Sequence, residues 1–203
     1  MKVSIAYPIT NDPTGGGNQF LRCLKKEFIK TGDYTEDYKD ADIILYNGHH
    51  EIELVSQLKA QYPGKKFVHR IDGLQKLYNK PSDERQDIAI NFNKLSNGTI
   101  FQSCWAKDEF SKINFNPAKS TVIHNCADEQ IFNKSSRAKV LSSKTELLCT
   151  SWSPNTNKGF NFYKLLDKKL DFSRYDFTFI GNKPQDINYK NIKCFPPRNS
   201  QEI

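Results

Sequence analysis

The chain has 203 residues, of which 37% are hydrophobic and 12% are aromatic, with 14 Phe and 9 Tyr among them. This composition excludes a disordered tail and supplies the core of one large domain, or of one domain and part of a second. The 30 basic and 23 acidic residues give a formal charge of +7, but no basic stripe with interleaved aromatics occurs. The charge therefore does not indicate nucleic acid as a partner. It fits anionic small ligands and peripheral contact with an anionic membrane surface equally well.

The five cysteines lie far apart, in neither a CxxC pair nor a Cys/His metal-binding spacing, and are expected to be reduced thiols. The opening stretch, MKVSIAYPIT, holds too short an apolar run for a signal peptide. No segment approaches the roughly 18 apolar residues of a membrane span. We therefore expect a cytoplasmic protein, associated with membranes at most by surface contact.

The chain begins with the pattern of a strand, a glycine loop and a helix. Residues 2–7 predict the strand, and three glycines at 15–17 form the loop. Residues 18–30 predict the helix, because apolar side chains recur there at helical spacing. These side chains are Phe20, Leu21, Leu24 and Phe28. A second strand within residues 32–38 stays open, because that stretch is polar.

Two further strand and helix pairs follow. Residues 42–46 (DIILY) predict a buried strand, and residues 51–62 predict a helix. The apolar stripe of this helix is Ile52, Val55, Leu58 and Tyr62. Residues 66–70 predict the next strand. A long polar loop, 72–81, then leads to a helix over 82–95, which its first residue, a serine, is expected to cap.

The first predicted domain, residues 1–134, contains two more strands, at 99–102 and 120–124. In the helix between them we expect Ser103 as the N-cap and Trp105 as a core residue, rather than as a nucleophile and a stacking platform. Strands that alternate with helices predict an α/β fold. The expected architecture is a Rossmann-like parallel sheet with helices on both faces and all strand carboxyl ends at one edge.

The rest of the chain predicts a linker and an incomplete second unit. Residues 135–144 are rich in Ser and Lys, as a linker would be. Residues 145–203 predict the start of a second Rossmann-like domain. Its strands are expected at 146–150, 176–180 and 192–195, and its helix at 158–170. The helix is expected to bury Phe162, Leu165, Leu166 and Leu170. So few elements leave one face of the sheet uncovered.

The loop Thr14-Gly-Gly-Gly-Asn18 is either a plain tight turn or a phosphate-binding loop, because glycines let the N–H groups of a helix start approach a phosphate closely. The loop does not match the dinucleotide-binding fingerprint, because Phe20 stands at the third position, where glycine or alanine is needed for the helix to pack on the strand. A nicotinamide or flavin enzyme is therefore disfavoured.

All the histidines, His49, His50, His69 and His124, fall at or just beyond the ends of predicted strands. Any one of them is as readily a structural hydrogen-bonding residue as a functional one, but their common edge favours a site. Because His49 and His50 are adjacent, we expect their rings to point apart and no metal to be bound.

The densest polar cluster at a strand end is His69-Arg70-Ile71-Asp72-Gly73. A pairing of Arg70 with Asp72 that holds the loop is as plausible as a functional role for the two. His69 is the better functional candidate. In the second unit, Lys158 places a cation where a helix begins, which is unfavourable unless an anion compensates it. Lys158 is therefore a candidate for phosphate binding.

Taken in order, the glycine loop, HRIDG, IFQSCW, VIHNCADEQIF and NKGF resemble the retaining glycosyltransferases of family four, which have the GT-B fold. The resemblance covers nearly the whole chain, and VIHN-x-x-D followed by IF is similar to the usual end of the family's N-terminal domain. It implies two Rossmann-like domains that face each other across a cleft. The acceptor would lie mainly on the first domain and the nucleotide-sugar donor mainly on the second.

The resemblance also implies roles for individual residues. Gly16 and Gly17 match the loop that approaches the donor diphosphate, and Lys158 matches the basic residue that binds it. His69 resembles the histidine near the transferred sugar and is the expected catalytic residue. The expected residues of the acceptor side and the cleft are Asn47, His49, Arg70, Asp72 and Asn125.

Three departures bear on activity. Cys126 stands where the family commonly has Gly, and Trp152 stands about where it has an Arg, which removes a bidentate phosphate contact. The later half of the family's donor domain, with its paired glutamates, is absent from this sequence. A truncated donor domain is therefore expected.

We accordingly expect a glycosyltransferase, or a truncated part of one, that transfers a hexose with retention from a nucleotide sugar to a carbohydrate or lipid-linked acceptor. The nucleotide sugar is the co-substrate, and neither a cofactor nor a metal is expected. The alternative is a non-catalytic acceptor-binding module, whose donor site a protein partner or the missing carboxyl-terminal segment would complete. A third reading is a nucleotide-binding Rossmann enzyme of another type.

Overall fold

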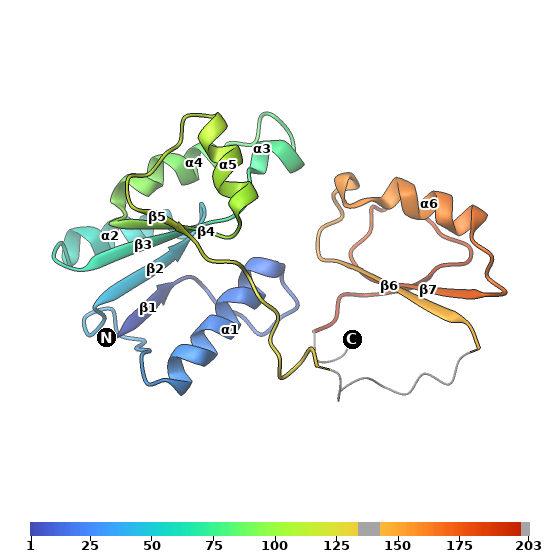
Figure 1. Ribbon diagram of the computed structural model, residues 1–203, viewed down its shortest axis with the longest axis horizontal. Helices are drawn as coiled ribbons and strands as arrows, with labels where there is room; N and C mark the ends of the chain where they lie inside the picture. The colour runs from blue at the N-terminus through green and yellow to red at the C-terminus, as the bar shows by residue number, and fades with distance from the viewer. Residues whose placement is uncertain (134–142, 200–203) are drawn as a thin grey trace. The chain divides into compact units, whose positions relative to one another are not determined.

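The computed structural model describes residues 1–133 and 143–199 (Figure 1). The chain divides into two compact units, Met1–Thr10 with Gly16–Cys126, and Asn11–Gly15 with Ala127–Ile203. The predicted linker falls almost entirely on residues 134–142, which lie outside the described part of the chain. The predicted domain borders therefore stay predictions.

The first unit is built on five parallel strands in the order β1-β2-β3-β4-β5. The strands are β1 (Val3–Ala6), β2 (Ile43–Asn47), β3 (Lys66–Ile71), β4 (Gly98–Phe101) and β5 (Ser120–Val122). The helices are α1 (Gly16–Lys30), α2 (Ile52–Gln61), α3 (Gln75–Tyr78), α4 (Arg85–Phe92) and α5 (Cys104–Lys112), with the 3-10 turn η1 (Asn93–Leu95). Leu45 pairs with Ile5 on one side and Val68 on the other, so the strand carboxyl ends share one edge. The predicted Rossmann-like α/β fold is confirmed.

Alternate side chains of the central strands point to opposite faces of this sheet, and helices cover both faces (Figure 1). On one face, α1 packs against β1 and β2 through Val3, Ile5, Leu21 and Leu45. On the other face, α2 and α4 pack against the sheet through Ala6, Ile44, Tyr46, Val55, Leu58, Phe67 and Phe92. The apolar stripes predicted for α1 and α2 are confirmed, since all of their members lie in or against these two clusters.

A short parallel contact extends the sheet beyond β1. Val3 N donates to Asp33 O over 2.7 Å, and Thr35 N donates to Val3 O over 3.0 Å, on the side of β1 away from β2. This contact settles the segment that the sequence left open. After β1 the chain passes through α1 to residues 33–35 on one side of β1. It then crosses to the other side of β1, where it forms β2. Open parallel sheets bind ligands at such a reversal, outside the strand carboxyl ends.

The predicted start of α4 differs from the structure, whereas the predicted start of α5 agrees with it. α4 begins at Arg85, and Ser82 does not cap it; instead the Asp83 carboxylate accepts from Arg85 N over 3.1 Å and pairs with the Arg85 guanidinium. A carboxylate two residues before the helix competes better for this N–H than the more distant hydroxyl. Ser103 does cap α5, since its Oγ accepts from Ala106 N over 3.1 Å. The short helix α3 was not predicted.

The second unit has three parallel strands in the order β6-β7-β8: β6 (Thr145–Ser151), β7 (Tyr175–Gly181) and β8 (Lys193–Phe195). The 3-10 turn η3 (Thr156–Lys158) precedes α6 (Phe160–Lys169), which packs on one face of the sheet. The side chains that α6 and its C-cap pack toward the sheet are buried Phe160 and partly buried Tyr163, Leu166 and Leu170. The prediction that Phe162 and Leu165 are buried is wrong, because Gly159 (φ +87°) breaks the turn and α6 starts with Phe160 in the core.

The opposite face of this small sheet carries no helix among the described residues. Leu148 of β6 and Phe195 of β8 are exposed there, while Leu147 and Cys149 pack toward α6. Ile180 on the same face is nevertheless 9% exposed, so the described residues show a face without a helix rather than a bare one. None of the described helices is long and apolar enough to cross a membrane.

Candidate functional site

The first turn of α1 lies at the carboxyl edge of the first sheet, beside the end of β2. A Cβ at Gly16 would meet nothing within 4 Å, and one at Gly17 would meet only Asn47 Nδ2, at 3.8 Å. The preceding loop is closed by buried Asn18, which donates from Nδ2 to Thr10 O over 2.9 Å and accepts from Thr10 N over 3.0 Å. A 15-residue helix without an acidic residue in its first turn presents free N–H groups and a positive dipole end there. These features suit an anion.

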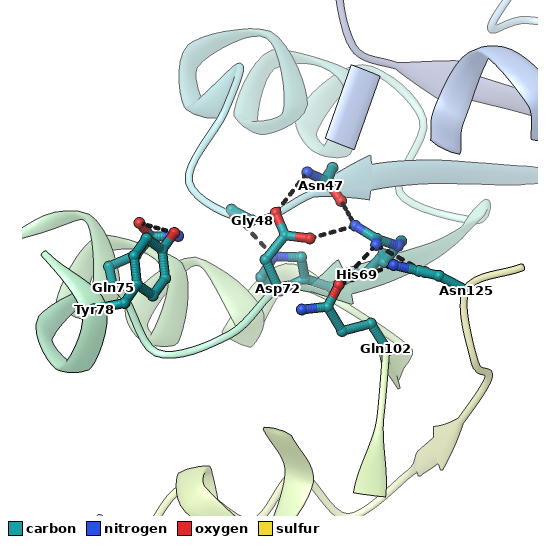
Figure 2. A network of polar contacts seen from close by, with 9 residues as sticks. Asn47, Gly48, His69, Asp72, Gln75, Tyr78, Gln102 and Asn125 are labelled. Carbon is teal, nitrogen blue, oxygen red and sulfur yellow. Dashed lines mark hydrogen bonds and ion pairs between the residues drawn. The ribbon is translucent and has the colours of Figure 1, made fainter. Parts of the chain in front are cut away.

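A network of hydrogen bonds at the same edge includes Asn47, Asp72, Gln102 and Asn125 (Figure 2). All four accept from the Arg70 guanidinium. Nη1 of this buried guanidinium donates to Asp72 Oδ1 and to Asn47 Oδ1, each over 2.5 Å. Nη2 donates to Asn125 Oδ1 over 3.1 Å and to Gln102 Oε1 over 3.2 Å. The partners stand at the ends of β2, β3, β4 and β5, so a single cation ties the carboxyl ends of four strands together.

Phe20 completes the surroundings of this cation. The Arg70 guanidinium carbon lies 4.3 Å from the centroid of the Phe20 ring, within the range of a cation–π contact. This contact explains why an aromatic residue occupies the third position of the glycine fingerprint. Asn47 joins the network to the start of α1, since its Nδ2 donates to Asp72 Oδ2 over 3.2 Å and lies next to Gly17.

His69 is completely buried within β3, and its ring stacks on Tyr46 with centroids 4.3 Å apart. Its Nε2–H donates to Gly48 O over 2.8 Å, and its Nδ1 accepts from Asn93 Nδ2 over 3.0 Å, a tautomer assigned from these partners. Burial lowers the pKa of His69 to about 4, so the ring is neutral at pH 7. Because both ring nitrogens are engaged inside the protein, this geometry favours a positioning role. The expected catalytic role of His69 stays a prediction.

His49 and His50 lie side by side just after β2, with ring centroids 4.1 Å apart. The expectation that their rings point apart is wrong, because positive φ angles at Gly48 and Glu51 turn the chain where an extended strand would alternate its side chains. Burial lowers the pKa of His50 and, with His50 beside it, lowers that of His49 to about 4. In the described ranges, no group of three or more His, Cys, Asp or Glu side chains is arranged to hold a metal ion. His124 is exposed beyond β5.

At this edge the sequence did not identify Gln102, and it assigned Trp105 to the core. Gln102, directly after β4, shares the Arg70 network. Trp105 is 54% exposed, so its assignment to the core is wrong: Ala106 and Phe110 take the buried positions of α5. The position of Gln102 as the last residue of a predicted strand was the available signal, because Asn47 and Asp72 also lie at the ends of predicted strands.

In the second unit, Lys158 is an exposed residue at the end of η3. The Asn155 side chain caps this turn by accepting from Asn157 N over 2.9 Å. Gly159 then reverses the backbone, and α6 begins one residue later. The predicted cation thus stands just before the first turn of α6, where helix N–H groups are free to bind an anion.

No protein-family model matches the chain, and none of the curated proteins does, but several solved structures are similar to it. One is a putative UDP-N-acetylglucosamine 2-epimerase from Listeria monocytogenes, with a TM-score of 0.54, 12% identity and coverage of 91% of this chain and 51% of the other. S. aureus MnaA in a co-structure with UDP has a TM-score of 0.56, 13% identity and coverage of 91% and 53%. An alpha-glucosyltransferase in complex with UDP and a 13-mer DNA containing a HMU base has a TM-score of 0.59, 13% identity and coverage of 97% and 66%.

These likenesses show a shared fold, that of the GT-B type found in UDP-sugar glycosyltransferases and epimerases. The chain spans about half the length of the two bacterial structures and about two-thirds of the glucosyltransferase. Sequence identities this low support a shared fold, and they do not show a shared function.

Proposed function

We propose that this chain binds a nucleotide sugar at the carboxyl edge of its first unit and transfers the sugar to an acceptor. The supporting observation is the glycine start of α1, which lies beside a preorganised polar network at the point where the sheet reverses direction. Structures of the same fold have been solved with UDP and with UDP-glucose, which makes a uridine nucleotide the first donor to test.

In the proposed reaction, the bond between the anomeric carbon and the diphosphate oxygen breaks, and the acceptor oxygen bonds to the same carbon with retention of configuration. The acceptor proton passes to the departing diphosphate. The amides of Gly16 and Gly17 stabilise the negative charge that develops on the diphosphate, and no metal is proposed for this step. Phosphate binding by Lys158 stays a separate proposal for the second unit. His69 holds the Gly48 turn, and His49 and Asp72 face the acceptor.

The experiment is incubation of the purified chain with UDP-, GDP- and ADP-sugars, with two readouts. Release of the nucleoside diphosphate reports turnover, and the melting temperature reports binding. The proposal expects a raised melting temperature and release with one donor class. No binding of any of the three would overturn it, and conversion of UDP-N-acetylglucosamine to an isomer without UDP release would replace transfer by epimerisation.

A second candidate is a non-catalytic acceptor-binding module, and the uncovered face of the β6-β7-β8 sheet favours it. Exposed Leu148 and Phe195 on that face suit contact with a further polypeptide that completes the donor site. Sedimentation together with donor hydrolysis separates the two candidates. A monomer that hydrolyses a nucleotide sugar excludes the module, whereas an associating chain without hydrolysis supports it.

A further inference from the structure

Trp105 is a large aromatic side chain that the core of the first unit does not use. It lies in the first turn of α5 and is 54% exposed, whereas Ala106 and Phe110 bury the opposite side of the helix. A flat apolar ring in this position adds little to folding but is available to a ligand. It stands at the carboxyl edge of the sheet, where α5 begins just after β4.

The indole of Trp105 and the amide of Gln102 both lie beside Gly73. A Cβ at Gly73 would lie 3.8 Å from Trp105 Cζ3 and 3.8 Å from Gln102 Nε2. Without a side chain at Gly73, the indole edge and the glutamine amide both lie against the backbone that follows β3. The two groups therefore come together at one point of the surface, next to Asp72.

Gln102 presents an oriented hydrogen-bond donor at that point. Its Oε1 accepts from Arg70 Nη2 over 3.2 Å and from Asn125 Nδ2 over 3.1 Å, which fixes the orientation of the amide. Its Nε2 donates to no group within residues 1–133 and 143–199. The carboxylate of Asp72, 27% exposed, is held on the same edge by its pairing with Arg70.

We infer that Trp105 and Gln102 form a subsite for a neutral pyranose ring of the acceptor. The apolar C–H face of the ring stacks on the indole, one sugar oxygen accepts from Gln102 Nε2, and a neighbouring hydroxyl donates to Asp72. Mixed donors and acceptors beside an aromatic face suit a sugar. A phosphate backbone would require unpaired cations, and here Arg70 is already paired with Asp72. That the bound sugar is the acceptor rests on the proposed function, whereas binding of the sugar itself does not depend on donor turnover.

The test begins with methyl glycosides and disaccharides of glucose, N-acetylglucosamine, mannose and galactose, screened by saturation-transfer NMR against the full chain. The sugar that binds best is then titrated calorimetrically into the wild type, Trp105→Ala, Gln102→Leu and the control Ile113→Ala. Ile113 is an exposed apolar side chain at the other end of α5. We expect a loss of about tenfold for Trp105→Ala and roughly fivefold for Gln102→Leu, and no loss for the control.

Trp105→Phe keeps an aromatic face and is expected to retain most of the affinity that Trp105→Ala loses. Unchanged affinity in Trp105→Ala would overturn the inference, as would the absence of binding by every sugar tested. So would a finding that only a DNA oligonucleotide or a phospholipid vesicle binds in a Trp105-dependent manner. UDP binding is measured on the same variants: its absence with sugar binding intact refutes the proposed function and leaves the subsite standing.

Discussion

Asn93 donates from its side-chain amide to Nδ1 of His69 over 3.0 Å, and this bond ties η1 to the middle of β3. The same amide donates to Thr99 Oγ1 over 2.8 Å, so its orientation is set from β4 as well. The only proton that the neutral His69 ring carries then lies on Nε2, which holds Gly48 O. The turn that leads to His49 and His50 is therefore fixed from inside the sheet.

The free energy of unfolding is expected to fall as the pH drops from about 6.5 to about 4. In the unfolded chain His69 binds a proton below its ordinary pKa of 6.5, whereas in the folded chain burial delays protonation to about pH 4. This one group contributes a slope of about 1.4 kcal/mol per pH unit in that window and nothing above it. Urea unfolding across the window measures the slope. His69→Gln, which does not titrate, should show a shallower dependence, and equal slopes would contradict the assignment.

Asp72→Ala is expected to destabilise the first unit by about 3 kcal/mol, because it leaves the Arg70 charge buried without its carboxylate. The matched control is Asp87→Ala, which removes a carboxylate from the exposed pair with Lys76 and should cost less than about 1 kcal/mol. Chemical denaturation of both variants at pH 7 gives the comparison. Similar losses in the two variants would show that the Arg70 network does not hold the strand ends.

Gly16→Ala is expected to stabilise the free protein by about 0.5 to 1 kcal/mol, because alanine is the better helix residue and its Cβ meets no atom within 4 Å. The added methyl group stands where the proposed diphosphate would approach, so UDP affinity should fall by about tenfold. Gly64→Ala, with equally open space, should leave UDP affinity unchanged. Melting curves with and without UDP measure both effects, and equal UDP shifts in the two variants would speak against a diphosphate at α1.

Gly181→Ala is expected to destabilise the second unit by about 3 kcal/mol or more. At this residue, with φ +138°, a Cβ would lie 1.9 Å from Ser151 O on the neighbouring strand β6. Gly32→Ala is the control, since its positive φ carries strain but no clash. Limited proteolysis with mass spectrometry locates the unfolding. If the second unit stays folded in Gly181→Ala as it does in Gly32→Ala, the close approach of β6 and β7 is contradicted.

Hydrophobic periodicity predicted the strands and the helices α1 and α2 because Leu21 and Val55 face a sheet that buries each of them. It failed for α6, where Gly159 shifts the start of the helix and thereby rotates its buried stripe. It also could not place Trp105, since the two buried positions of this short helix are taken by Ala106 and Phe110, which leaves Trp105 to face solvent. The spacing of apolar residues therefore predicts the buried side chains only where the sequence also shows clearly where the helix or strand begins.

The candidate site was predicted less completely than the fold. Strand ends indicated Asn47, Arg70, Asp72 and Asn125, and the structure brings these four together. The hydrogen bond between Arg70 and Asn125, 55 residues later, depends on the order of the strands in the sheet. Hydrophobic periodicity along the sequence does not contain that order. The same holds for His69, whose partners Gly48 and Asn93 come from either side of it in the chain.

Titration of UDP into the isotopically labelled chain, followed through the backbone amide resonances, tests whether the first unit binds a nucleotide diphosphate at the start of α1. We expect the amide resonances of Gly16, Gly17 and Asn18 to shift with increasing UDP and to saturate, while those of the distant turn at Gly64 do not move. Binding without shifts at α1, or no binding of UDP, would contradict it.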